Sequence, residues 1–230
     1  NNVCGVFTMS HWLYNYMLTS KDISQDKICY VGGGVNLDVD KIEYSKKTGN
    51  KILFVGKDFI RKGGDLVYRA FGILNEKYQQ DAELYIVGPQ ELPLSIDNDN
   101  VHFMGEMSAD NVVEYFNLCD IFVMPSRFEA YGLVFIEALS FGLPCIGRNK
   151  YEMPYFIEDG ETGMLIDDDD EEELALKMFN LLNNKQVFKN VRDKREYYLK
   201  EYSWDTVARR MLEFIDNQEN KLSQECLGIG

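Results

Sequence analysis

The feature that most constrains the fold of this chain is an alternation between short apolar runs and longer segments with helical apolar spacing. The first run that is both apolar at every position and followed by a segment with helical spacing spans residues 52–55. Gly56 comes directly after this run. Similar short runs, most of whose residues are apolar, follow along the chain at 83–87, 101–104, 120–124, 144–146 and 164–166. A run without polar positions is typical of a strand buried on both faces. Because strands that alternate with helices form βαβ units, the sequence predicts an α/β fold with a parallel sheet covered on both faces.

The expected helices have apolar residues spaced about one turn apart. The clearest spans 65–78, where Leu66, Ala70 and Leu74 share one face. A second follows Ser108, which we expect to cap it, and a third spans 132–141. Helices are predicted to fill most of 171–217.

Upstream of residue 51 the chain has a different character. Short apolar runs at 5–9 and 28–31 flank a helical pattern at 11–18, and a polar stretch follows three consecutive glycines. We therefore predict four parts, namely 1–36, a linker at 37–50, a main domain at 51–201, and a C-terminal helix and tail at 202–230.

Charge and cysteine usage limit the classes of partner. Lys and Arg number 24 against 38 Asp and Glu, a net charge of −14, which argues against nucleic acid because phosphate contacts require cations. Five cysteines without a CxxC pair indicate buried thiols in a reducing compartment. We expect a cytoplasmic protein, with peripheral association at the inner membrane face of the full-length protein left open.

Two loops carry the candidate chemistry, and the first is residues 56–65, GKDFIRKGGD. It holds Lys57, Arg61 and Lys62, followed by two glycines and the start of a helix. Cations next to a helix N-terminus favour an anion such as a diphosphate. The alternative is a basic surface loop that only caps the helix.

The second loop and its helix span residues 126–144, SRFEAYGLVFIEALSFGLP. Glu129 lies in the loop, and Glu137 lies inside the helix that begins near Gly132. A carboxylate there can accept two hydrogen bonds from a ribose diol. The alternative is that the helix dipole alone favours Glu137.

The order of these motifs resembles the donor-binding domain of family 4 glycosyltransferases (group 1 glycosyl transferases), whose fold is called GT-B. The resemblance covers about residues 50–217. The matching residues are Gly56, Lys57, Lys62, Gly63, Pro125, Ser126, Glu129, Gly132, Glu137, Ala138, Gly142 and Pro144, with the turn 159–163. It implies that the sheet is Rossmann-like and forms one half of a GT-B fold. It also implies that 1–36 is the end of an acceptor domain that is otherwise missing.

The resemblance implies a retaining transferase that moves a sugar from a nucleoside diphosphate sugar to a glycan or lipid-linked acceptor, in polysaccharide or glycoconjugate biosynthesis. Neither a metal nor a cofactor is implied. Glu129, Lys62 and Lys57 would be catalytic, with Lys57 and Lys62 on the diphosphate, Glu129 facing the donor sugar and Glu137 on the ribose. The implied binding residues are Gly56, Lys57, Lys62, Gly63, Tyr131, Gly132, Leu133 and Glu137.

Some features depart from the family pattern or leave alternatives open. Relatives often carry a glutamate after a proline in the loop 147–160, where this chain has Tyr155 after Pro154. The identity of the sugar therefore stays open. Without most of an acceptor domain, the isolated chain is expected not to act on an acceptor. A nucleotide-sugar epimerase of the same fold and an inactive donor-binding module are the competing hypotheses.

Overall fold

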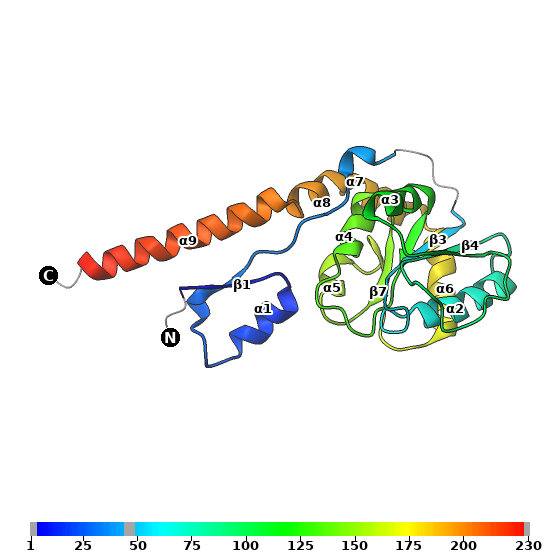
Figure 1. The fold of residues 1–230 in the computed structure, drawn as a ribbon, viewed down its shortest axis with the longest axis horizontal. Helices are drawn as coiled ribbons and strands as arrows, with labels where there is room; N and C mark the ends of the chain where they lie inside the picture. Colours follow the sequence, from blue (N-terminus) through cyan, green and yellow to red (C-terminus); the bar gives the residue numbers. More distant parts are fainter. Residues whose placement is uncertain (1–3, 44–48, 228–230) are drawn as a thin grey trace. The chain divides into compact units, whose positions relative to one another are not determined.

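A computed structural model describes residues 4–43 and 49–227, and its central feature is a six-stranded parallel sheet (Figure 1). The strand order is β5-β4-β3-β6-β7-β8. The strands are β3 (Lys51–Val55), β4 (Glu83–Val87), β5 (Val101–Gly105), β6 (Ile121–Val123), β7 (Cys145–Arg148) and β8 (Gly163–Ile166). Every pairing is parallel. The predicted α/β class with a Rossmann-like parallel sheet is confirmed.

Helices flank this sheet and supply the rest of the core. They are α2 (Gly64–Lys77), α3 (Ala109–Leu118), α4 (Leu133–Ser140), α5 (Met153–Phe156), α6 (Glu171–Leu182), α7 (Lys185–Asp193) and α8 (Arg195–Glu201). The predicted apolar face of α2 is fully buried at Leu66, Ala70 and Leu74. Large aromatic side chains fill the space between helices and sheet, among them Phe54 and Phe122 on strands.

The chain divides into two compact units. One comprises Asn36–Leu199 and contains the whole six-stranded sheet. The other comprises Asn1–Val35 with Lys200–Gly230. In it, β1 (Val6–Thr8) pairs in parallel with β2 (Ile28–Tyr30), and the helices are α1 (His11–Leu18) and α9 (Trp204–Leu227). A short 3₁₀ turn lies at Gln25–Lys27 in this unit, and another at Val39–Lys41 in the unit with the large sheet.

Local details differ from the sequence-based expectations. Ser108 does occupy the N-cap position of α3, but its side chain makes no capping hydrogen bond. Helix α5 was not expected, because its four residues are too few to show a period. Helix α9 continues to Leu227, beyond the predicted end. Cys4 is exposed rather than buried, since it precedes β1 instead of lying within a strand.

The strand order creates a switch point between β3 and β6. These two strands are neighbours, yet the chain leaves β3 toward β4 on one side and leaves β6 toward β7 on the other. Loops that leave adjacent parallel strands in opposite directions open a crevice at the carboxyl edge of the sheet. Residues 56–63 follow β3 and residues 124–132 follow β6, so both predicted functional loops meet at this edge. The backbone N–H of Arg127 donates to the carbonyl of Arg61 at 2.8 Å and joins them.

Gly63 allows this close approach. It caps α2 in the left-handed conformation, with φ of 79°, and a Cβ at this position would lie 2.7 Å from the carbonyl oxygen of Pro125. We expect Gly63→Ala to lower the unfolding free energy by about 1–3 kcal/mol, because the added carbon strains the backbone and clashes with backbone. Urea denaturation of the purified chain measures this change.

A matched control lies in the same helix. Gly72 has no neighbouring atom within 4 Å of an added Cβ and no positive φ. Gly72→Ala should raise stability by about 0.5–1 kcal/mol, because alanine favours helix interiors. A Gly63→Ala protein as stable as Gly72→Ala would show that the contact with Pro125 imposes no constraint.

Candidate functional site

The centre of the candidate site is an ion pair between Lys62 and Glu129. The Lys62 Nζ contacts Glu129 Oε2, and the two side chains are only 15% and 8% exposed. Lys62 precedes α2 and Glu129 lies between β6 and α4, so the pair crosses the switch point. The structure thus brings together two of the three residues predicted to be catalytic. Both belong to the unit that contains the large sheet.

Two glycines of the predicted motif shape the surroundings of this pair. A Cβ at Gly56 would lie 2.9 Å from Cγ of Lys62, so the lysine stem packs directly on this glycine. Gly132 is the N-cap of α4 with φ of 94°, and a Cβ there would lie 3.0 Å from Cγ of Glu129. The glycines therefore give both charged side chains the space to approach each other.

Glu137 lies on the helix that follows, and it is buried. Its exposed fraction is 9%, and burial raises the pKa of its carboxyl group. The backbone N–H of Asn36 donates to Oε1 at 3.4 Å, the one hydrogen bond made by this carboxyl group within residues 4–43 and 49–227. A carboxylate has about four acceptor positions, so Glu137 keeps capacity for further donors such as hydroxyl groups.

The third predicted catalytic residue, Lys57, does not join the Lys62–Glu129 pair. Its side chain is 78% exposed and forms an ion pair with Glu106, at the end of β5. Arg61 is held by Asp58 at 2.9 Å and by the carbonyl of Phe128 at 2.8 Å. The three cations of the first loop therefore point to three different sets of partners.

The remaining predicted residues lie at the start of α4. Leu133 is the first residue of the helix, directly after its cap Gly132. Tyr131 is buried, and its ring stands edge-on to Phe156 of α5 with centroids 5.2 Å apart. Phe128 is exposed and stands edge-on to Tyr151, whose φ of 58° is rare for a residue with a side chain.

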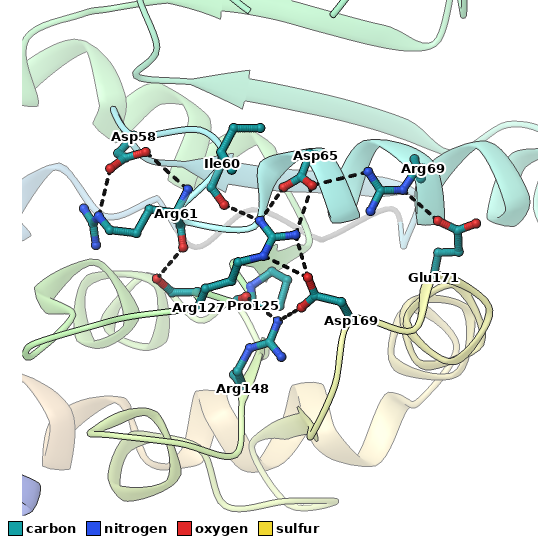
Figure 2. Close-up of polar contacts among 11 residues, drawn as sticks. Asp58, Ile60, Arg61, Asp65, Arg69, Pro125, Arg127, Arg148, Asp169 and Glu171 are labelled. Carbon is teal, nitrogen blue, oxygen red and sulfur yellow. Dashed lines mark hydrogen bonds and ion pairs between the residues drawn. The ribbon is translucent and has the colours of Figure 1, made fainter. Parts of the chain in front are cut away.

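Sequence reasoning missed a set of ion pairs beside the two loops, shown in Figure 2. Arg127 contacts both carboxylate oxygens of Asp65, at 2.6 and 3.0 Å, and its Nε donates to Asp169 at 2.8 Å. Arg148 also ion-pairs with Asp169. The one available signal was an arginine two residues before Glu129, which indicates no partner by itself.

Across 4–43 and 49–227, no group of three or more His, Cys, Asp or Glu side chains is placed to hold a metal ion. Of the helices described there, none combines the length and hydrophobicity that crossing a membrane requires. Asp38, the first residue of an Asp-x-Asp sequence, caps a 3₁₀ turn.

The fold and the site define a Rossmann-like α/β domain with a charged site at its switch point. Residues 38–201 match the family described as glycosyl transferases group 1, and the chain belongs to this family. The resemblance predicted from the motifs is confirmed.

Relatives agree with this membership. The chain is 34% identical over 160 residues to an uncharacterized 41.2 kDa protein in the cps region of Klebsiella pneumoniae, covering 64% of this chain and 44% of that protein. It is 31% identical over 161 residues to the N-acetyl-alpha-D-glucosaminyl L-malate synthase of Bacillus anthracis, covering 66% and 41%. The chain thus spans less than half the length of each of these two relatives.

Solved structures share the fold. A glycosyltransferase from Rickettsia africae superposes with a TM-score of 0.76 at 20% identity, over 93% of this chain and 63% of that chain. A TarM mutant from S. aureus, crystallised with fondaparinux, alpha-GlcNAc-glycerol and UDP, superposes with a TM-score of 0.75 at 20% identity, over 92% and 43%.

The Lys62–Glu129 pair should behave as a coupled unit in stability measurements. Either Lys62→Met or Glu129→Gln alone leaves a mostly buried group without its partner, whereas the double substitution removes both. We expect a coupling energy of about 0.5–3 kcal/mol from the four urea unfolding curves. Additive effects of the two substitutions would show that the pair contributes no interaction.

Glu137→Gln should stabilise the chain at neutral pH. A carboxyl group whose pKa is raised by folding contributes stability below its unfolded pKa and loses it as pH rises through the folded pKa. The substitution removes this cost of burying a charge. Its gain in thermal stability should therefore be largest near neutral pH and shrink below about pH 4.5. A gain that is the same at pH 4 and pH 7 would contradict the assigned cause.

Proposed function

We propose that this chain is the donor-binding part of a retaining glycosyltransferase that takes its sugar from a nucleoside diphosphate sugar. The observation that carries the proposal is the Lys62–Glu129 pair at the switch point, followed on α4 by the buried carboxylate of Glu137. In open parallel sheets such crevices bind ligands at the carboxyl ends of the strands. Family membership and the shared fold support a glycosyl-transfer activity.

In this proposal Lys62 and the N-terminus of α2 hold the diphosphate. Lys62 directly precedes the cap Gly63, so a diphosphate held by its ammonium group would lie near the N-terminus of the helix. Both favour an anion. Their positive charge would stabilise the diphosphate as it leaves, without a divalent metal. Lys57 would have to break its ion pair with Glu106 before it could contact the diphosphate.

Glu129 and Glu137 have different proposed roles. Glu129 lies beside Lys62 and faces the donor sugar and the diphosphate, where its charge also fixes the lysine. Glu137 accepts hydrogen bonds from the ribose diol, for which a buried carboxylate with spare acceptor positions is suited. Tyr131, Gly132 and Leu133 line the start of α4 between the two glutamates.

The proposed acceptor is a glycan or a lipid-linked molecule, in polysaccharide or glycoconjugate biosynthesis. Named relatives support this class. One is a GDP-mannose-dependent phosphatidylinositol monomannoside mannosyltransferase of Mycobacterium tuberculosis, and a structural neighbour is WaaG, a glycosyltransferase involved in lipopolysaccharide biosynthesis. We propose that acceptor recognition needs a further domain, so that the 230-residue chain binds donor without transferring its sugar.

Calorimetric titration of the chain with UDP, GDP and ADP in EDTA tests the proposal. We expect one of the three to bind, and Lys62→Met to weaken it by about ten- to a hundredfold, since a charge-assisted contact is worth about 1.5–3 kcal/mol. The same substitution should lower the affinity for the corresponding nucleoside much less. Glu137→Ala should weaken nucleoside and nucleotide alike, with a smaller effect on a 2′,3′-dideoxy analogue.

The matched control is Lys77→Met, at the opposite end of α2 from Lys62. Lys77 is exposed and paired with Glu172 at 2.7 Å, so its loss should leave binding unchanged. If no nucleoside diphosphate binds to the unmodified chain, the donor-binding proposal fails. If affinity collapses in EDTA and returns with manganese, the metal-independent part of the proposal fails.

A further inference from the structure

Arg127 lies two residues before Glu129, and its guanidinium is the centre of the ion-pair network in Figure 2. It makes a two-pronged contact with Asp65 and contacts Asp169 at 2.8 Å through Nε and 2.6 Å through Nη2. Its Nη1 also donates to the carbonyl of Ile60. A guanidinium has five N–H donors in a rigid plane, and here that plane is shared among three acceptors.

The partners of Arg127 are on the segment that carries Lys62. Ile60 is two residues before Lys62, and Asp65 is in the first turn of α2. The backbone reinforces this connection, since Arg127 N–H donates to the Arg61 carbonyl at 2.8 Å. Arg127 therefore joins the lysine segment to the glutamate segment through both its side chain and its backbone.

Asp169 extends the connection to the next two strands. It follows β8 and accepts from Arg127 and from Arg148, a buried residue at the end of β7. Arg148 in turn donates to the carbonyl of Pro125 at 3.3 Å, directly before the glutamate loop. The loops after β3, β6, β7 and β8 are thus held by two arginines and two aspartates.

We propose that Arg127 is a positioning residue that fixes Lys62 and Glu129 relative to each other for binding the diphosphate. Arg127 acts through the two loops and does not contact the ligand, because its donors are committed to carboxylates and a carbonyl. The ligand assignment rests on the proposed function, whereas the ordering of the two loops is independent of it. The hydrogen bonds to Asp65 and Asp169 also raise the pKa of Arg127, as expected for a fully engaged guanidinium.

Arg127→Gln and Arg127→Lys test the proposal, with Arg69→Gln as the matched control. Arg69 also pairs with Asp65, at 3.3 Å, but its second partner is Glu171 on α6 rather than the site. Hydrogen exchange in the absence of ligand should be at least about tenfold faster at 59–64 and 126–132 in Arg127→Gln, and unchanged there in Arg69→Gln. Arg127→Lys should be intermediate, because a lysine cannot bridge two carboxylates in one plane.

A second measurement separates positioning from general stability. UDP with uridine, and GDP with guanosine, are titrated into each protein. Arg127→Gln should lower the affinity for the diphosphate about tenfold more than the affinity for its nucleoside. The reason is that Glu137, the proposed ribose ligand, bonds to Asn36 and not to a residue of the network. Should Arg127→Gln not fold, Asp169→Asn removes one partner and leaves the Arg127–Asp65 contact in place.

The outcomes are distinguishable. Loop exchange equal to that of Arg69→Gln would overturn the proposal, whatever the affinities are. The positioning role would also be overturned if Arg127→Gln exchanged faster in the loops but lost no affinity, or lost equal affinity for nucleoside and diphosphate. If the unmodified chain binds none of these probes, the proposed function fails, and hydrogen exchange alone then decides whether Arg127 orders the two loops.

Discussion

The pairing of β3 with β6 is the contact on which the rest of the site depends. Ile52 pairs with Ile121 and Leu53 with Phe122, and all four side chains are fully buried. Because the strands are parallel, their carboxyl ends lie at the same edge, and residues 67 apart in sequence form one ion pair there. The apolar pairing of β3 with β6 in the core therefore brings Lys62 and Glu129 together at the edge of the sheet.

The cations near the candidate site differ in their partners, and Lys62 is the one that lies at its centre. The chain carries 38 acidic residues, and Arg61, Lys57 and Arg127 each have carboxylate partners near the edge of the sheet. Lys62 differs because it and its partner Glu129, in the facing loop, are both mostly buried, whereas the other three cations are more exposed. Water screens this pair less than the exposed ones, so its geometry is more strictly defined.

The fold could be predicted because its signals are local in the sequence. The ion-pair network could not be predicted, because its partners lie far apart in the sequence. Runs such as 52–55 are apolar at every position, and Gly63 directly precedes a helical pattern, so strand and helix could be assigned from neighbours alone. The contact of Arg127 with Asp169 joins the loops after β6 and β8, and that of Lys57 with Glu106 joins the ends of β3 and β5. Such pairs depend on strand order, which composition and spacing leave undetermined. The proposed roles of the site residues, and the functional boundaries at 36, 50 and 201, stay predictions.

Several unfavourable features are concentrated at this edge of the sheet. Glu137 is a buried carboxylate with one long hydrogen bond, and Tyr151 adopts a left-handed backbone conformation beside Phe128. Each costs free energy that the core must offset, and such costs persist where the surrounding structure over-determines the conformation. At the same edge, the network of Arg127, Arg148, Asp65 and Asp169 holds the loops that carry Lys62 and Glu129. A site that must hold two charges at fixed positions before ligand arrives requires such support, because a loose pair would lose ordering entropy at every binding event.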